Sequence, residues 1–173
     1  MWIALFSQSG SEIVEVSNKL GRWPDIVFSN NKDKDTIHKD LRRRSCLRIN
    51  THNKIVADLE REASMWGSPL VTLHGYLRIM PDLPYEMYNG HPGDIVKYPE
   101  LKGKDPQAKA LKLGLPSTGC VIHRVTSELD GGPIVSRGEY IMQGNENELT
   151  LINNLRILSI DMWVDFLKEK LNG

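Results

Sequence analysis

The chain has 173 residues, and its 22 Lys and Arg balance its 22 Asp and Glu, so the formal charge is zero. This length suits one domain with a sizeable core, and the neutral balance gives no reason to expect nucleic acid or an anionic membrane surface as a partner. No apolar run approaches the roughly 18 residues of a membrane span, and the N-terminus lacks the basic start of a signal peptide. Cys46 and Cys120 lack metal-site spacing. We therefore expect a single cytoplasmic domain over residues 1–173.

The first half alternates short apolar runs with helical patterns. Strands are predicted over 2–7, 24–30, 46–50 and 68–76, and helices over 11–21, 34–44 and 53–66. Gly21 is placed to end the first helix. Alternation of this kind favours βαβ units and a parallel sheet with right-handed crossovers.

The second half has a different pattern. A helix is predicted over 105–114, with Asp105 as its N-cap, Pro106 at the first helical position and Gly114 as its stop. Strands are predicted over 118–126 and 133–142, and a long helix over 147–171. No repeat or interdomain linker interrupts the chain.

Three short motifs have both a functional and a purely structural interpretation. "SQSGSE" at 7–12 stands where the first strand passes into a helix, so it is either an anion cradle or a plain turn. "HGYLRIM" at 74–80 places Arg78 just past a strand end, which on its own favours a surface arginine. His123 lies among apolar residues on a predicted strand, where a histidine usually has a structural role.

Two further motifs carry candidate catalytic groups. "NGHP" at 89–92 begins with the strongest short turn dipeptide, but in an extended segment Asn89 and His91 would point to one face and could both donate to one oxyanion. "ELDGGP" at 128–133 is a loop in which Asp130 is either a turn residue or a carboxylate that manages protons. Taken alone, the "NGHP" motif favours the turn.

The order and spacing of these motifs resemble the folate-dependent formyltransferase family, and most of all its branch that formylates glycinamide ribonucleotide. The resemblance runs from Trp2 to the closing helix and is densest from Gly75 to Val135. It implies an α/β fold, namely a single Rossmann-like domain with a mostly parallel twisted sheet flanked by helices. It further implies a nucleotide- and phosphate-binding half at 1–76 and a folate-binding, catalytic half at 77–173. The implied co-substrate is 10-formyltetrahydrofolate, with no metal.

The resemblance also assigns roles to individual residues. Asn89, His91 and Asp130 match the catalytic trio, and His123 supports Asp130. The implied folate-binding residues are Leu77, Arg78, Ile79, Met80, Val125, Glu128, Leu129 and Gly131, and the implied substrate- and phosphate-binding residues are Ser9, Gly10, Ser11 and Pro92. We expect Asn89 and a protonated His91 to stabilise the oxyanion, with Asp130 raising the pKa of His91 and shuttling protons.

Several positions depart from the family pattern, and they concern the acceptor. Glu12 stands where a neutral Asn is usual, and Asp94 would bring a charge to the substrate entrance. Ile157 stands roughly where the family places a Glu that holds the substrate amine, and residues 102–106 replace a His-rich stretch. The expected acceptor is glycinamide ribonucleotide or a similar phosphorylated amine.

Other acceptors and one different class of function stay open at this point. The alternatives are a modified nucleotide, an amino sugar or methionyl-tRNA as acceptor, and a non-catalytic folate- or nucleotide-binding module. The length and neutral charge make a tRNA substrate less expected, as relatives of that kind carry a further C-terminal domain. A homodimer is compatible with the sequence.

Overall fold

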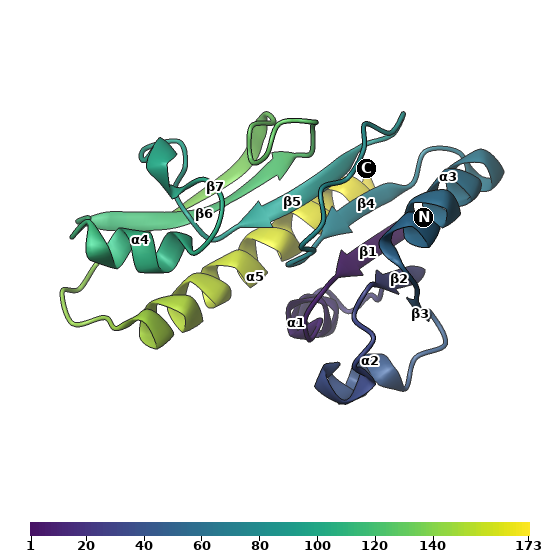
Figure 1. Cartoon of the computed structure of the whole chain (residues 1–173), viewed down its shortest axis with the longest axis horizontal. Coiled ribbons are helices and arrows are strands. Elements are labelled where there is room, and N and C mark those ends of the chain that lie inside the picture. The colour runs from purple at the N-terminus through teal and green to yellow at the C-terminus, as the bar shows by residue number, and fades with distance from the viewer.

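The computed structural model describes all 173 residues as one seven-stranded mixed sheet flanked by helices (Figure 1). Its strands follow the order β3-β2-β1-β4-β5-β6-β7. Their bounds are β1 Trp2–Phe6, β2 Ile26–Ser29, β3 Leu47–Ile49, β4 Leu70–Leu73, β5 Met87–His91, β6 Ser117–Arg124 and β7 Ile134–Ile141. Pairs among β1 to β5 are parallel, while β6 pairs antiparallel with both β5 and β7. The mostly parallel α/β sheet expected from the sequence is therefore confirmed.

The helices cover both faces of this sheet. Their bounds are α1 Ser11–Leu20, α2 Lys39–Arg42, α3 His52–Trp66, α4 Pro106–Lys112 and α5 Glu148–Asn172, with short 3-10 turns at Lys34–Thr36 and Pro99–Leu101. The segment predicted as one helix at 34–44 is thus divided into a 3-10 turn at Lys34–Thr36 and the four-residue helix α2. No helix is long and apolar enough to cross a membrane.

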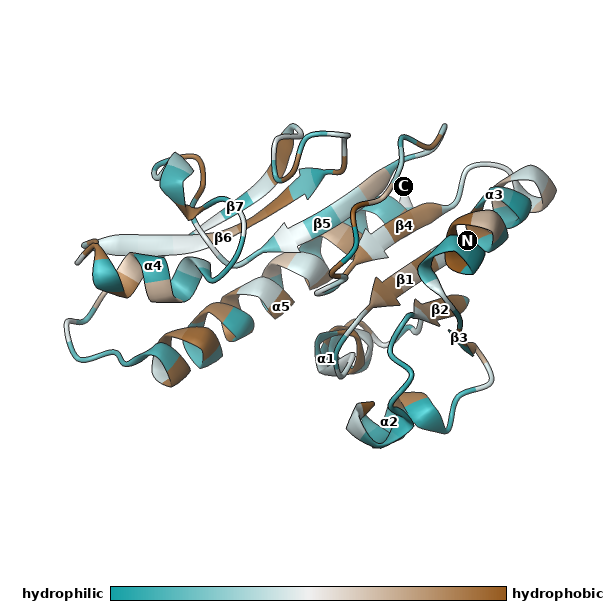
Figure 2. Ribbon diagram, viewed as in Figure 1, coloured by the Kyte–Doolittle hydropathy of each residue, from teal (hydrophilic) through white to brown (hydrophobic).

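Strand β1 lies between two apolar layers and is hydrophobic along its length (Figure 2). Ile3 and Leu5 pack with α3 on one face, and Ala4 and Phe6 pack with α1 on the other. Because alternate side chains of a strand point to opposite faces, a continuous apolar run is what burial on both sides requires. On the α1 face, α5 adds a second and larger cluster around Trp163 against β5 and β6.

Glycines in the left-handed conformation bound the first helix. Gly10 precedes α1 with φ 70°, and Gly21 follows it with φ 74°, as the predicted stop requires. The predicted N-cap of α4 is wrong in one respect. Asp105 precedes the helix, but its own φ is 54° and its side chain makes no capping hydrogen bond, because a cap needs an extended backbone at that residue.

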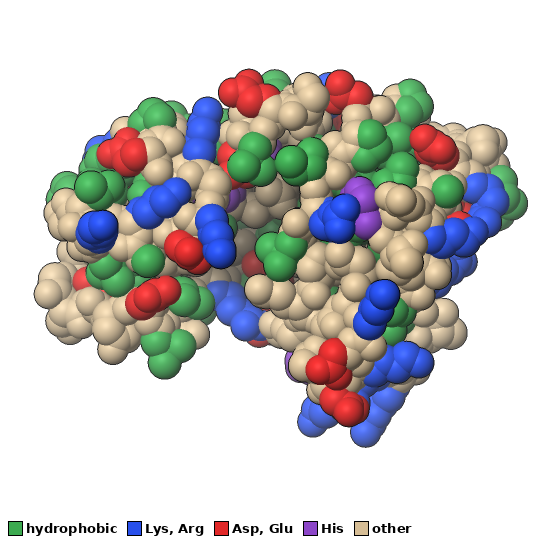
Figure 3. All heavy atoms as spheres, viewed as in Figure 1, with side chains coloured by type: hydrophobic (Ala, Val, Ile, Leu, Met, Phe, Trp, Pro, Cys, Tyr) green, Lys and Arg blue, Asp and Glu red, His purple; other side chains and the backbone are tan.

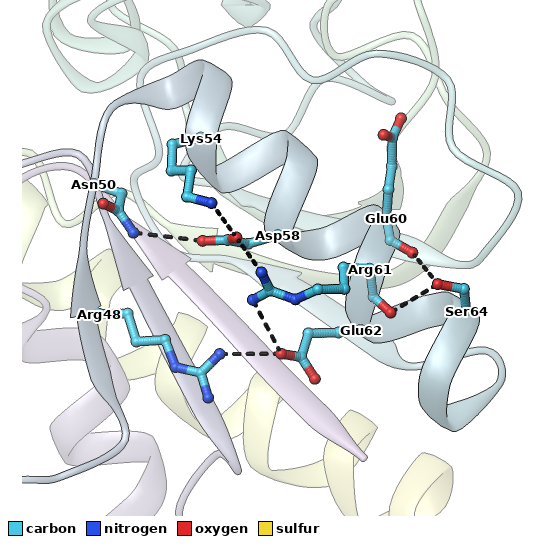
Figure 4. A network of polar contacts seen from close by, with 8 residues as sticks. All are labelled: Arg48, Asn50, Lys54, Asp58, Glu60, Arg61, Glu62 and Ser64. Carbon is cyan, nitrogen blue, oxygen red and sulfur yellow. Dashed lines mark hydrogen bonds and ion pairs between the residues drawn. The ribbon is translucent and has the colours of Figure 1, made fainter.

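A network of ion pairs fixes α3 against the edge of the sheet (Figure 4). The buried Asp58 forms ion pairs with two residues of its own helix, Lys54 at 3.1 Å and Arg61 at 3.2 Å. Glu62, also buried, pairs with Arg48 of β3 at 3.1 Å. Paired carboxylates of this kind fix the orientation of a helix more than they add stability.

Candidate active site

The "NGHP" segment is a strand end and not a turn. Asn89, Gly90 and His91 are the last three residues of β5, so the side chains of Asn89 and His91 share one face. Asn89 is paired with Leu73 of β4 on one side and with His123 of β6 on the other. The tight-turn interpretation of Asn-Gly is therefore wrong at this position, because the sheet on both sides holds the dipeptide extended.

Burial and one hydrogen bond fix the chemical state of His91. Its Nε2–H donates to the carbonyl oxygen of Leu101 at 2.8 Å, and its Nδ1 lies 3.5 Å from Oδ2 of Asp130. Burial lowers the pKa of His91, and the opposing effect of Asp130 does not make up for it. The expectation of a raised pKa is thus wrong for the unliganded protein: His91 is neutral at pH 7 and presents an unprotonated Nδ1.

Asp130 is held at the tip of the 125–133 loop. Its backbone is left-handed, with φ 51°, and its Oδ2 accepts from the backbone N–H of Gly103 at 2.8 Å. Burial alone would raise its pKa, but hydrogen bonds from His123 and Gly103 and the nearby His91 outweigh burial and leave the pKa below its usual range. Asp130 is therefore an ionised carboxylate next to an unprotonated ring nitrogen.

His123 connects Asp130 to Asn89. Its Nδ1–H donates to the carbonyl oxygen of Arg124 at 3.1 Å. Its Nε2 lies 3.3 Å from both the Asn89 amide nitrogen and Oδ1 of Asp130. The same nitrogen can accept from Asn89 when neutral and donate to Asp130 when protonated. His123 is thereby placed to orient both of its neighbours.

A cavity of about 630 Å³ lies on the α3 side, beside the loops predicted to bind folate. Ile79 and Met80 line it together with Ser127 and the first turns of α3. To one side of this cavity, Figure 3 shows a hollow near the middle of the face, between the part built from β6, β7 and α4 and the part that contains β1 to β4 and α3. The other predicted folate-binding residues do not line this cavity: Leu77, Arg78, Glu128 and Leu129 are exposed around it, and Val125 and Gly131 are half-buried in the second loop.

A second cavity of about 230 Å³ lies on the α1 and α5 side of the same strand end. All four predicted substrate residues line it, namely Ser9, Gly10, Ser11 and Pro92. Gly90 borders it as well, from the face of β5 opposite to Asn89 and His91. Gly90 and Pro92 at the end of β5 thus line the second cavity, whereas Asn89, His91 and Asp130 line neither of the two cavities.

One predicted acceptor-side feature is wrong. Asp94 is fully buried and accepts from Arg137 at 3.0 and 2.6 Å, so it belongs to an internal ion pair and not to the entrance. Ile157 is 63% exposed and does not line the cavity. The wall of α5 is formed instead by Arg156 and Ser159, which lie on the adjoining face of the helix.

Some contributing groups carry no signal in the sequence. The Leu101 carbonyl and the Gly103 amide, which hold His91 and Asp130, are backbone atoms of a segment where the chain departs from the family pattern. His74 was noted only as part of a strand exit, yet its Nδ1 lies 2.8 Å from Glu12. The one feature of the sequence that points to a role for His74 is its position directly after an apolar strand.

Comparison with known proteins assigns the chain to a family. The sequence pattern of the family described as formyl transferase matches residues 4–165. The chain is 28% identical over 166 residues to the phosphoribosylglycinamide formyltransferase of Escherichia coli (strain K12), a match that covers 84% of this chain and 75% of that protein. It is 37% identical over 86 residues to a methionyl-tRNA formyltransferase of Thermotoga neapolitana, covering 50% of this chain and 26% of that protein.

Solved structures share the fold at lower identity. The phosphoribosylglycinamide formyltransferase of Campylobacter jejuni matches with a TM-score of 0.80 at 21% identity, covering 98% of this chain and 96% of that one. A formyltetrahydrofolate deformylase of Pseudomonas syringae matches with a TM-score of 0.79 at 18% identity, covering 99% and 61%. Because the family pattern matches residues 4–165, nearly the whole chain, the chain belongs to the formyl transferase family.

Proposed function

We propose that this protein transfers a formyl group from 10-formyltetrahydrofolate to a primary amine, with Asn89, His91 and Asp130 as the catalytic residues. The observation that supports this most is the convergence of the three side chains at the end of β5, the strand end whose Gly90 and Pro92 line the second cavity. We assign that cavity to the amine and the loops at 77–80 and 125–131 to the donor.

The reaction has one charge problem and one proton problem. When the amine nitrogen attacks the formyl carbon, the carbonyl oxygen becomes an oxyanion. One N–H of Asn89 is directed at His123, which leaves the second N–H of the carboxamide to donate to that oxyanion. The unprotonated Nδ1 of His91 can take the proton that the attacking nitrogen must lose.

Asp130 then stabilises the charge that His91 gains. The resulting imidazolium has Oδ2 of Asp130 at 3.5 Å and can donate its new Nδ1–H to the oxyanion or return the proton to the folate nitrogen as the C–N bond breaks. His91 is therefore a base first and a charged donor afterwards, which fits its lowered pKa in the free protein.

The 77–80 and 125–131 loops fit a flat, partly apolar donor. Leu77, Ile79 and Leu129 are 69%, 68% and 62% exposed, which is unusual for three large apolar side chains around one hollow. Contact with a pterin or benzoyl ring would cover them. We assign the eight predicted folate-binding residues to this donor side as part of the proposal.

The names of the relatives favour glycinamide ribonucleotide or a similar phosphorylated amine as the acceptor, which would place the protein in purine biosynthesis in the cytoplasm. A homodimer remains compatible with this proposal. The candidate from a different class is a folate-binding module without catalysis. Conversion of the donor distinguishes the two.

The direct test is to incubate the protein with 10-formyltetrahydrofolate and a panel of amines, including glycinamide ribonucleotide, and to measure release of tetrahydrofolate. We expect amine-dependent release that His91→Ala abolishes. His38→Ala, which changes a histidine at the start of α2, is the matched control and should retain activity. Donor binding without release for any amine would support the binding module. Release without an amine, together with formate, would indicate hydrolysis.

A further inference from the structure

Glu12 places a carboxylate in the cavity proposed for the acceptor. It lies in the first turn of α1, and its side chain is 26% exposed, whereas that of His74 is fully buried. Oε1 of Glu12 lies 2.8 Å from Nδ1 of His74, and Oε2 accepts from the hydroxyl of Ser159 on α5 at 3.2 Å. A side chain held from two elements in this way is preorganised and not a mobile surface group.

A series of hydrogen bonds lies behind Glu12. The indole N–H of Trp2 can only donate, and it donates to Oγ1 of Thr72 at 2.9 Å. The same Oγ1 lies 2.9 Å from Nε2 of His74 and can either donate to it or accept from it. Because an ionised carboxylate can only accept, Nδ1 of His74 carries a proton and donates it to Glu12.

Glu12 is an ionised carboxylate. Burial raises its pKa, but the hydrogen bond from His74, the charge interaction with His74, the hydrogen bond from Ser159 and the nearby Arg156 outweigh burial and leave the pKa below its usual value. Arg156 is the one Lys or Arg that lines the cavity; its Nη2 pairs with Glu15, while its buried Nε–H has no partner. A phosphate at this turn would thus meet an ionised carboxylate, beside an arginine whose charge is shared with Glu15.

Some polar groups of the turn at residues 9–11 already hydrogen-bond one another. The N–H of Ser11 donates to the hydroxyl oxygen of Ser9 at 3.3 Å, and the hydroxyls of Ser9 and Ser11 bond each other at 3.0 Å. A helix N-terminus attracts anions through free N–H groups and its positive end. Here Glu12, in the first turn of α1, adds a negative charge to the same cavity.

We propose that Glu12 is the acceptor-specificity residue: it accepts a hydrogen bond from a hydroxyl or ammonium group of the amine substrate, and the substrate carries no phosphate at this turn. His74 is its positioning residue. The inference rests on the proposed formyl transfer and revises only the acceptor that the relatives' names favour. Exclusion of the phosphate by a placed negative charge is a repulsive form of specificity.

The test uses two probes that differ in one group, glycinamide ribonucleotide and its dephosphorylated form, glycinamide ribonucleoside. Dissociation constants are measured by calorimetry without the donor, and kcat/KM is measured with 10-formyltetrahydrofolate. We expect the wild-type protein to bind and formylate the ribonucleoside at least about tenfold better, because its hydroxyl can donate to Glu12 where the phosphate is repelled.

Variants of the network separate recognition from folding. Glu12→Gln should remove the preference by strengthening binding of the phosphorylated probe, while Glu169→Gln, an exposed carboxylate near the end of α5, should leave it unchanged. His74→Asn should raise the KM of the ribonucleoside several-fold and leave the dissociation constant of the donor unaltered. A merely structural role of His74 would change both.

Two results would overturn the inference. One is tighter binding of the ribonucleotide than of the ribonucleoside by the wild-type protein, and the other is an unchanged preference in Glu12→Gln. Because binding is measured without the donor, an absence of tetrahydrofolate release would refute the proposed formyl transfer alone. Failure of both probes to bind would refute the inference.

Discussion

The two sides of the β5 strand end differ in how they are built. On the α3 side, Asn89 and His91 are placed by strand alternation and by pairing with β4 and β6. On the α1 and α5 side, the cavity is lined by side chains from helices and turns, among them Glu12, Arg156 and Ser159. A sheet register fixes its side chains rigidly, while helix-borne side chains can be exchanged without altering the fold. In the function proposed above, the chemistry therefore resides on the sheet and acceptor choice on the helices.

The largest expected effect tests the catalytic side. Asn89→Ala should lower kcat on the order of 10²–10³-fold, since that is the usual effect of removing one oxyanion donor. Steady-state kinetics with the best amine of the panel would measure it. The dissociation constant of the donor should change little, because Asn89 is proposed to act on the developing charge.

The matched control is Asn53→Ala, which removes a carboxamide from the wall of the donor cavity. It should leave kcat within a few-fold. If both asparagine variants lost kcat equally, the loss would report a general disturbance of the α3 side, and the contrast between the two sides of β5 would lose its catalytic half.

Substitution of Asp94 tests whether this residue contributes to stability or to the choice of acceptor. It is fully buried and paired with Arg137, which is 38% exposed. Asp94→Asn should lower the free energy of unfolding on the order of 2 kcal/mol, less than for a fully buried pair because Arg137 can regain water. Urea unfolding would measure it.

Glu139→Gln removes the weaker partner of Arg137, at 4.0 Å and exposed, and should cost little stability. Neither variant should alter the ratio of acceptor efficiencies. If Asp94→Asn changed the ratio of acceptor efficiencies, Asp94 would act at the substrate entrance after all. That result would contradict the internal position of its ion pair with Arg137.

Gly90 tests how closely the two sides approach each other. A Cβ on Gly90 would lie 2.8 Å from Nε1 and 3.2 Å from Cζ2 of the buried Trp163, which has no partner for its indole N–H. Gly90→Ala should therefore destabilise the fold by about 1–2 kcal/mol through overpacking. Chemical denaturation provides the measurement.

Trp163→Phe frees space at that contact. The double variant should be less destabilised than the sum of the two single variants by about 1 kcal/mol, a coupling that reports direct contact. Simple additivity would show that β5 can shift away from α5. The end of β5 would then not hold Asn89 and His91 in fixed positions.

How far the sequence predicts this site also differs between the two sides. The alternation of a strand was enough to place Asn89 and His91 on one face, provided that the segment is extended. The Asn-Gly dipeptide favoured a turn instead, because local preference cannot report the hydrogen bonds that β4 and β6 supply. The α/β fold followed from the alternation of apolar runs and helical patterns.

The groups that tune the site were not predictable from residue types. His91 receives its tautomer from the Leu101 carbonyl, and Asp130 is held by the Gly103 amide, and every residue has such backbone atoms. Burial, which reverses the expected direction of the His91 pKa shift, depends on the packing of the whole 91–106 segment. Glu12 was recognised as a departure, but its bond to His74 joins residues 62 positions apart in sequence.

The smallest expected effect concerns pH and distinguishes a neutral His91 from a charged one. Burial places the pKa of His91 below the ordinary value of 6.5. If His91 acts as the base, kcat/KM for the donor at saturating amine should keep more than half of its plateau value at pH 6.5. Below the pKa of His91 it should fall about tenfold per pH unit, because only the unprotonated form accepts the proton.

Asp130→Asn sharpens this prediction because it removes the one carboxylate that raises the pKa of His91. The acid limb of the residual activity should then move to still lower pH. A limb centred above pH 6.5 in the wild-type protein would mean that Asp130 dominates over burial and that His91 begins the reaction charged. In that case the proton of the amine would have to leave through Asp130 or His123, and the order of the two roles proposed for His91 would be reversed.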